Sequence, residues 1–157
     1  MEPRIYNLAE KGQNAFKAMY GLEMYLAKSS LEQSLRELVS FRVSQINGCA
    51  FCLDMHAKDM RVAGETEQRI YTLDAWREAP FYTERERAAF AWAESVTRVT
   101  AGHVPDEVYE IARSQFSEEE LIDLTIAVIA INSYNRLNIA FRTTAGTYEP
   151  GQFAHAK

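Results

Sequence analysis

Apolar residues recur at intervals of three and four positions along most of the chain. This spacing is typical of helices with one buried face, and no stretch shows the sustained alternation of apolar and polar residues that indicates a half-buried β-strand. Between residues 8 and 27 the spacing fits one helix or two short ones, because Gly12 and Gly21 weaken a single helix. The pattern therefore predicts an all-α fold.

One helix is predicted over residues 31–46, where leucine, valine and isoleucine supply a buried stripe. Ser30 followed by Gln33 has the form of a capping box that opens this helix, and Ser29 with Glu32 is an equally good frame. The dipeptide at positions 47–48, Asn-Gly, tolerates positive φ and suits a left-handed helix end.

A second helix is predicted over residues 50–63, closed by Gly64. Cys49 and Cys52 then lie in its first turn. At the angular spacing of an α-helix, the side chains of Cys49, Cys52 and His56 fall within a sector of about 60°. The three side chains are therefore expected to share one pocket.

Four further helix starts are marked by capping or first-turn residues: Thr66, Thr83 with Glu86, Pro105, and Ser117 with Glu120. The last helix, over residues 118–142, is apolar enough to lie centrally or in a subunit interface. It also carries Asn132, Asn135 and Asn138, which need hydrogen-bond partners if buried and predict an inter-helix or inter-subunit polar network. After Gly146 a loose tail, including His155, is expected.

The length of 157 residues suits one hydrophobic core, which predicts a single domain over residues 1–157. A composition of 47% hydrophobic and 25% charged residues excludes disordered and collagen-like classes. Lys and Arg are scattered and the net charge is −5, so the chain offers no basic stripe for nucleic acid. The apolar last helix and the limited core predict a homo-oligomer.

Residues 1–13 lack the apolar core of an export signal. The richest apolar stretch, residues 121–131, is interrupted by Asp123 and Thr125, so no membrane span is expected. The expected compartment is then a reducing cytoplasm, where paired cysteines are more often catalytic or metal-binding than permanent structural bonds. No flavin, haem or nicotinamide site is visible, and no cofactor is expected.

The residues around the two cysteines suggest thiol chemistry. A thiol in the first turn of a helix sees unpaired backbone N–H groups, which lower its pKa from about 8.5. Cys52 is therefore expected to attack, and Cys49 to resolve the oxidised sulfur by closing a disulfide. His56 can move a proton because imidazole titrates near neutral pH, and Glu37 can orient it or take the proton.

Six residues with these intervals resemble the core signature of the alkylhydroperoxidase D-like proteins of the carboxymuconolactone decarboxylase superfamily: Glu37, Arg42, Ser44, Cys49, Cys52 and His56. The resemblance is strong over residues 31–64. The length, the helical pattern and Asn135-Arg136 in the last helix agree with the smaller members of the superfamily.

The resemblance implies a multi-helix bundle in which Cys52 is the peroxidatic thiol, Cys49 the resolving thiol, and Glu37 and His56 a proton relay. It also implies reduction of hydroperoxides, electrons from an external dithiol such as a lipoyl group, and assembly as a trimer or hexamer. One departure is Phe51, where the better-characterised hydroperoxidases often have His before the second cysteine. The decarboxylase branch lacks the cysteine pair, so decarboxylation is not expected.

Other interpretations of the same residues remain open. Cys49, Cys52, His56 and Glu37 are four plausible zinc ligands, which would make the protein a zinc-binding module without enzymatic activity. The pair could also serve general thiol–disulfide exchange, or the cysteines could be buried apolar residues of a scaffold. Arg42 and Ser44 are expected to serve structure, with Arg42 pairing an acid.

Overall fold

The computed structural model describes residues 2–153. Over this range the chain forms helices and no β-strand, which confirms the all-α prediction. The α-helices are α1 (Leu8–Lys11), α2 (Gln13–Leu26), α3 (Gln33–Asn47), α4 (Ala50–Val62), α5 (Glu67–Thr72), α6 (Glu84–Thr97), α7 (Asp106–Gln115) and α8 (Glu118–Phe141). Two 3-10 turns lie at Leu73–Ala75 and Val99–Ala101. None of these helices is long and apolar enough to cross a membrane.

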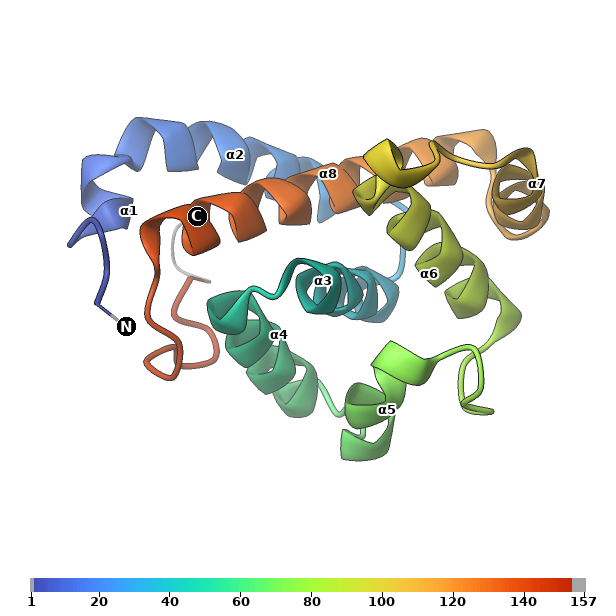
Figure 1. Cartoon of the computed structure of the whole chain (residues 1–157), viewed down its shortest axis with the longest axis horizontal. Helices are drawn as coiled ribbons and strands as arrows, with labels where there is room; N and C mark the ends of the chain where they lie inside the picture. Colours follow the sequence, from blue (N-terminus) through green and yellow to red (C-terminus); the bar gives the residue numbers. More distant parts are fainter. Residues whose placement is uncertain (1, 154–157) are drawn as a thin grey trace.

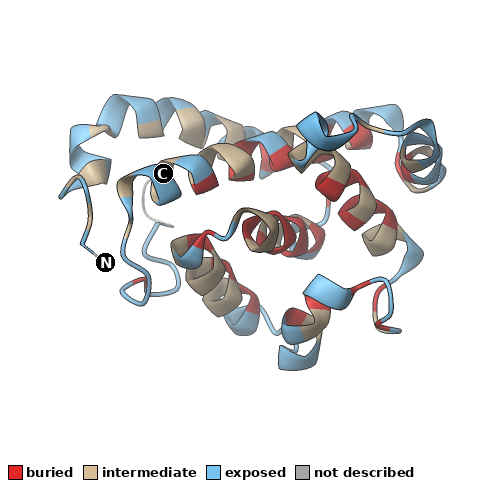
Figure 2. Ribbon diagram, in the orientation of Figure 1, coloured by how far each residue is buried: buried red, intermediate tan, exposed pale blue. Residues whose placement is uncertain are grey.

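Helix α3 lies at the centre of the fold, packed against α4, α6 and α8 (Figure 1). Its buried apolar side chains include Leu35, Leu38, Val39 and Val43, which belong to the main core cluster. The buried residues concentrate on α3, α6 and the middle of α8, whereas α1 and much of α2 are exposed or half-buried (Figure 2). The core therefore forms around α3, the helix that leads into the cysteine pair.

Several predicted helix starts are confirmed. Thr83 with Glu86 and Ser117 with Glu120 form complete capping boxes at α6 and α8, and the Thr66 hydroxyl accepts a hydrogen bond at the start of α5. Residues 8–27 form two helices rather than one, with Gly12 between them.

Two predicted helix starts are wrong. Helix α3 begins at Gln33, and Glu32 precedes it without a side-chain cap, so neither serine frame forms a capping box. The Ser29 hydroxyl instead donates to the carbonyl of Leu26 at 2.8 Å, at the end of α2. Pro105 was predicted at the first helical position, but it is the N-cap residue of α7, one position before the first helical residue, Asp106.

The described part of the tail is anchored rather than loose. Tyr148 is buried, and its hydroxyl donates to the carboxylate of Asp59 at 2.8 Å. Lys58 donates to the Tyr148 carbonyl at 2.9 Å, and the N–H of Gly146 donates to Asp54 at the same distance. These contacts fix the tail to α4, which sequence periodicity could not show because they join residues about ninety positions apart. His155 lies outside the described residues.

Candidate functional site

The turn between α3 and α4 places the cysteine pair. Gly48 adopts a φ of 70°, in the left-handed region, and ends α3 as the Asn-Gly dipeptide predicts. The N–H of Cys49 then donates to the carbonyl of Ser44 at 3.1 Å. Cys49 is the N-cap residue of α4 and Cys52 lies in its first turn. The predicted position of both cysteines at a helix start is therefore confirmed.

Cys49 and Cys52 are joined by a disulfide, with their Cα atoms 5.4 Å apart. Each cysteine is 1% exposed. Phe51, between them, is half-buried. The backbone geometry thus suits a disulfide, because Cα atoms of disulfide-bonded cysteines are typically about 5.5–6 Å apart.

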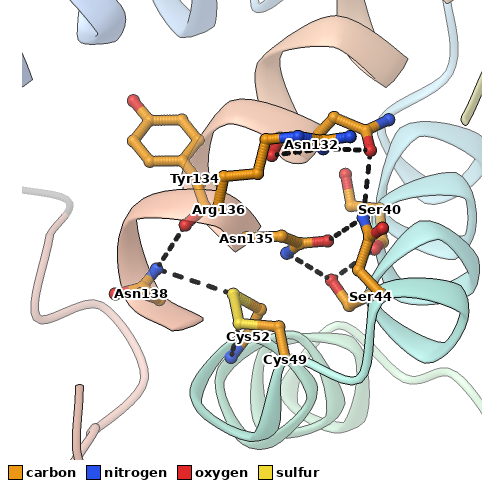
Figure 3. The surroundings of a disulfide bond; sticks show 10 residues. Ser40, Ser44, Cys49, Cys52, Asn132, Tyr134, Asn135, Arg136 and Asn138 are labelled. Atoms are coloured by element: carbon orange, nitrogen blue, oxygen red, sulfur yellow. Dashed lines mark hydrogen bonds between the residues drawn. A yellow bond between two sulfur atoms is a disulfide. The ribbon is translucent and has the colours of Figure 1, made fainter. Parts of the chain in front are cut away.

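Each sulfur receives a different hydrogen-bond donor. The backbone N–H of Cys52 donates to Cys49 Sγ at 3.4 Å, as an N-cap side chain accepts from the first turn. The side-chain amide of Asn138, on α8, donates to Cys52 Sγ at 3.6 Å (Figure 3). The helix-start N–H that sequence reasoning assigned to Cys52 thus contacts Cys49, and the donor to Cys52 comes from another helix.

His56 and Glu37 form a close pair one turn beyond Cys52. The distance from His56 Nδ1 to Glu37 Oε2 is 2.8 Å, and the side chains are 11% and 28% exposed. The other ring nitrogen of His56, Nε2, is buried and has no hydrogen-bond partner within residues 2–153. In this part of the chain, the ring is therefore held by a hydrogen bond at Nδ1 alone.

Two further acids lie near this pair, and sequence reasoning missed both. Burial raises the pKa of Glu23, on α2; the charge of His56 opposes this shift and the charge of Glu37 adds to it. Burial also raises the pKa of Asp59, against the hydrogen bond from Tyr148. The pKa of Tyr148 rises to about 12, through burial and the hydrogen bond to Asp59. Glu23 could not be assigned from spacing, because only the packing of α2 brings it close. Asp59 lies three residues beyond His56 on α4, a helical spacing that could have indicated it.

The asparagines of α8 form the predicted polar network, and it joins α8 to α3. Asn135 is fully buried and donates to the Ser44 hydroxyl at 3.0 Å (Figure 3). Asn47 donates to the side-chain oxygens of Asn132 and Asn135 at 3.0 and 2.9 Å. The network fixes α8, and with it Asn138, against the helix that precedes the cysteines.

Arg42 has the structural role expected of it. Its guanidinium is buried and pairs with Glu94 on α6 at 2.8 Å and with Asp74. Trp76 and Arg77 also donate to Glu94. Burial alone would raise the pKa of the Glu94 carboxyl, but the hydrogen bonds from Arg77, Trp76 and Arg42 outweigh it and lower the pKa.

The four residues considered as zinc ligands are arranged as two pairs. Cys49 is bonded to Cys52, and His56 is paired with Glu37. Among the residues that the structure describes, no group of three or more His, Cys, Asp or Glu side chains is positioned to hold a metal ion. With the two cysteines bonded to each other, the four donors do not form the tetrahedral set that a structural zinc site requires.

Comparison with known proteins identifies the family. The sequence model of the carboxymuconolactone decarboxylase family matches residues 11–95. The chain belongs to this family. The matched segment includes both cysteines, His56 and Glu37.

Relatives are found over most of the chain. It is 45% identical over 142 residues to the uncharacterized protein YdfG of Bacillus subtilis, which covers 90% of this chain and 95% of YdfG. It is 31% identical over 115 residues to the uncharacterized protein YnjA of Escherichia coli, covering 72% of this chain and 62% of YnjA.

Solved structures share the fold. A protein of unknown function from Agrobacterium tumefaciens, suggested to be the antioxidant defence protein AhpD, superposes with a TM-score of 0.89 at 43% identity, covering 94% of this chain and all of that one. The resemblance to alkylhydroperoxidase D-like proteins is thus confirmed. The debrominase Bmp8 superposes with a TM-score of 0.76 at 21% identity, covering 88% of this chain and 74% of its own; this likeness shows the fold alone.

Proposed function

We propose that the protein is a thiol-dependent peroxidase that reduces hydroperoxides through a dithiol–disulfide cycle of Cys49 and Cys52. The observation that carries this proposal is the pairing of two buried sulfurs at the start of α4 with the His56–Glu37 pair one turn further on. Membership of a superfamily that includes enzymes, and the likeness to a suggested AhpD protein, support it.

In the proposed cycle the thiolate of Cys52 attacks the terminal oxygen of a hydroperoxide. The O–O bond breaks, the alkoxide takes a proton and leaves as an alcohol, and Cys52 becomes a sulfenic acid. The thiolate of Cys49 then attacks Cys52 Sγ, hydroxide leaves as water after taking a proton, and the disulfide forms. An external dithiol, such as a lipoyl group, supplies the two electrons that restore both thiols.

His56 and Glu37 would supply and receive the protons of this cycle. Because Glu37 holds Nδ1 of the imidazole, Nε2 is the nitrogen that can deliver a proton to the leaving alkoxide. The buried position of the ring shields this nitrogen from bulk water, which would otherwise exchange protons with it. A reducing cytoplasm is the compartment that fits such a cycle, because it must be reset by a dithiol.

Peroxide consumption tests the proposal. With an organic hydroperoxide and dihydrolipoamide, we expect sustained turnover by the native chain and none by Cys52→Ser. Cys49→Ser should complete a single turnover and then stop, because the sulfenic acid cannot be resolved. Stoichiometric zinc with unfolding on chelation, and no peroxide consumption, would contradict the proposal and support the zinc-binding alternative.

A further inference from the structure

Asn138 donates a hydrogen bond to Cys52 Sγ. This donor lies on α8 rather than on α4, the helix that carries the thiols. Helix starts are the usual source of thiolate stabilisation, since unpaired N–H groups point at the sulfur. Here that N–H, from Cys52, points at Cys49 Sγ instead. The N–H group that can stabilise a thiolate on Cys52, the sulfur proposed to attack, therefore comes from a side chain of another helix.

The amide of Asn138 is held in place by its surroundings. Its Nδ2 also donates to the carbonyl of Tyr134 at 3.0 Å, so that its two N–H groups serve one backbone oxygen and one sulfur (Figure 3). One turn earlier, Asn135 is bound to Ser44 on α3. The network therefore sets the distance between α8 and the disulfide, and the half-buried Asn138 lies within reach of Cys52 Sγ.

We propose that Asn138 is a catalytic residue that stabilises the thiolate of Cys52 and makes Cys52 the sulfur that leaves when the disulfide is reduced. An N–H donor is worth more to a charged sulfur than to a neutral one, so it favours thiolate over both thiol and disulfide. This inference rests on the proposed function in assigning the attacking role to Cys52.

The reduction step then has a defined direction. A thiolate of the external dithiol attacks Cys49 Sγ, the bond between the two protein sulfurs breaks, and its electron pair stays on Cys52, next to the Asn138 amide. The second thiol of the donor, once deprotonated, attacks its own sulfur in the mixed disulfide and releases Cys49, which takes up a proton. The donor ends as a disulfide and the protein as a dithiol.

The test measures the pKa of Cys52 directly, without peroxide. In a Cys49→Ser background Cys52 is the sole cysteine of the chain, and its thiolate is followed by ultraviolet absorbance against pH. We expect Asn138→Ala to raise the pKa of Cys52 by about one unit, a roughly tenfold loss of thiolate below the pKa, because a hydrogen bond to a charged group is lost. Asn138→Asp, of nearly the same size, should raise it further, because it replaces a donor with a negative charge.

Ser133→Ala is the matched control, since Ser133 lies on α8 outside the asparagine network and its hydroxyl donates to the carbonyl of Ile129 in the same helix at 2.9 Å. The other titratable groups of the site, His56, Glu37 and Glu23, are the same in every variant compared. An unchanged pKa of Cys52 in both Asn138 variants, or an equal shift in Ser133→Ala, would overturn the inference. Absence of peroxide consumption by the native chain would instead overturn the proposed function and leave this pKa result standing.

With both cysteines present, the same substitutions test the leaving-group role. The disulfide of Asn138→Ala should be reduced by dithiothreitol more slowly than that of the native chain or of Ser133→Ala, because a leaving thiol of higher pKa departs more slowly. Equal rates of reduction in all three proteins would contradict this part of the inference.

Discussion

The imidazole of His56 is held in a way that distinguishes its two nitrogens. Nδ1 lies 2.8 Å from the Glu37 carboxylate, while Nε2 is buried without a partner among the described residues. An unpartnered buried nitrogen costs stability, so its presence in a family with enzymatic members fits a role in binding or proton transfer. In the proposed cycle, Glu37 positions the ring and His56 contacts the substrate.

We predict that His56→Ala and Glu37→Gln slow the oxidation of the dithiol by peroxide roughly 10²–10⁴-fold if the pair acts in general acid–base catalysis. The measurement is the single-turnover rate of disulfide formation, followed by mass spectrometry. Both variants should still form the Cys49–Cys52 bond at completion. Glu110→Gln, at an exposed acid on α7, is the control and should react at the native rate. Native rates in both site variants would rule out the relay.

The positions of the site residues near the cysteines could be predicted where neighbouring residues in the sequence determine them. The helix start at Cys49 follows from the Asn47-Gly48 turn, and His56 follows from helical spacing. The donor to Cys52 could not be assigned in this way, because Asn138 lies 86 positions further along the chain. The sequence predicts that the asparagines of α8 need partners, but only the packing of α8 on α3 and α4 shows that one partner is a sulfur.

At the scale of elements, α3 and α6 are joined by a buried ion pair. Arg42 and Glu94 are 5% and 6% exposed, and Glu94 also accepts from Trp76 and Arg77. Because the pKa of Glu94 is lowered in the folded chain, its carboxylate contributes stability above the usual value of 4.5. That contribution is lost as the pH falls through the lowered folded-state pKa.

We therefore predict that Glu94→Gln lowers the free energy of unfolding at pH 7 by roughly 3 kcal/mol, since it leaves the buried charge of Arg42 without its main partner. Urea unfolding at pH 7 and at pH 3 provides the measurement, and the gap between native chain and variant should shrink at pH 3. Glu84→Gln, at an exposed acid on the same helix, should change stability by less than about 0.5 kcal/mol. A gap that stays constant with pH would contradict this account.

Helix boundaries show where local sequence is sufficient. The capping boxes at Thr83 and Ser117 form where the sequence offers one candidate N-cap residue, with a glutamate three residues later. Before α3, two serine frames compete, and the Ser29 hydroxyl finds the carbonyl of Leu26 at the end of α2 instead. The competing hydrogen bond is itself local, because Ser29 and Leu26 are three positions apart, so the capping-box pattern was ambiguous within the local sequence.

At the scale of the whole molecule, α8 leaves an apolar stripe in contact with solvent. Ile122 and Ile129 are 61% and 45% exposed, and Ile126, half-buried, lies on the same face between them. On α2, next to α8, Tyr25 is 51% exposed. Exposed apolar side chains gathered on one helix face are typical of surfaces that bind another protein.

We predict that the chain forms a homo-oligomer through this stripe of α8, with trimer and hexamer as the expected orders. Light scattering at micromolar concentration is the measurement, and Ile129→Glu should shift the native chain toward monomer by placing a charge in the interface. Val62→Glu, at an exposed position of α4, is the control and should leave the assembly intact. A monomeric native chain would contradict the assembly without affecting the thiol chemistry.

The sequence predicted the helical class and the site core because both depend on periodicity and short spacings. It did not predict the anchored tail. Tyr148 reaches Asp59 on α4 through contacts between distant positions, and the expectation of a loose tail rested on local composition alone. Glu23 was missed for the same reason, since it approaches His56 only through the packing of α2.

The central claim is that Cys52 attacks the peroxide and Cys49 resolves the product, and sulfenic-acid trapping tests it most directly. The Cys49→Ser and Cys52→Ser variants are each treated with one equivalent of hydroperoxide and a dimedone-type reagent, and the labelled residue is identified by peptide mass spectrometry. The account predicts label on Cys52 in Cys49→Ser and no label in Cys52→Ser. Label on Cys49 in Cys52→Ser, with peroxide consumption retained, would contradict it.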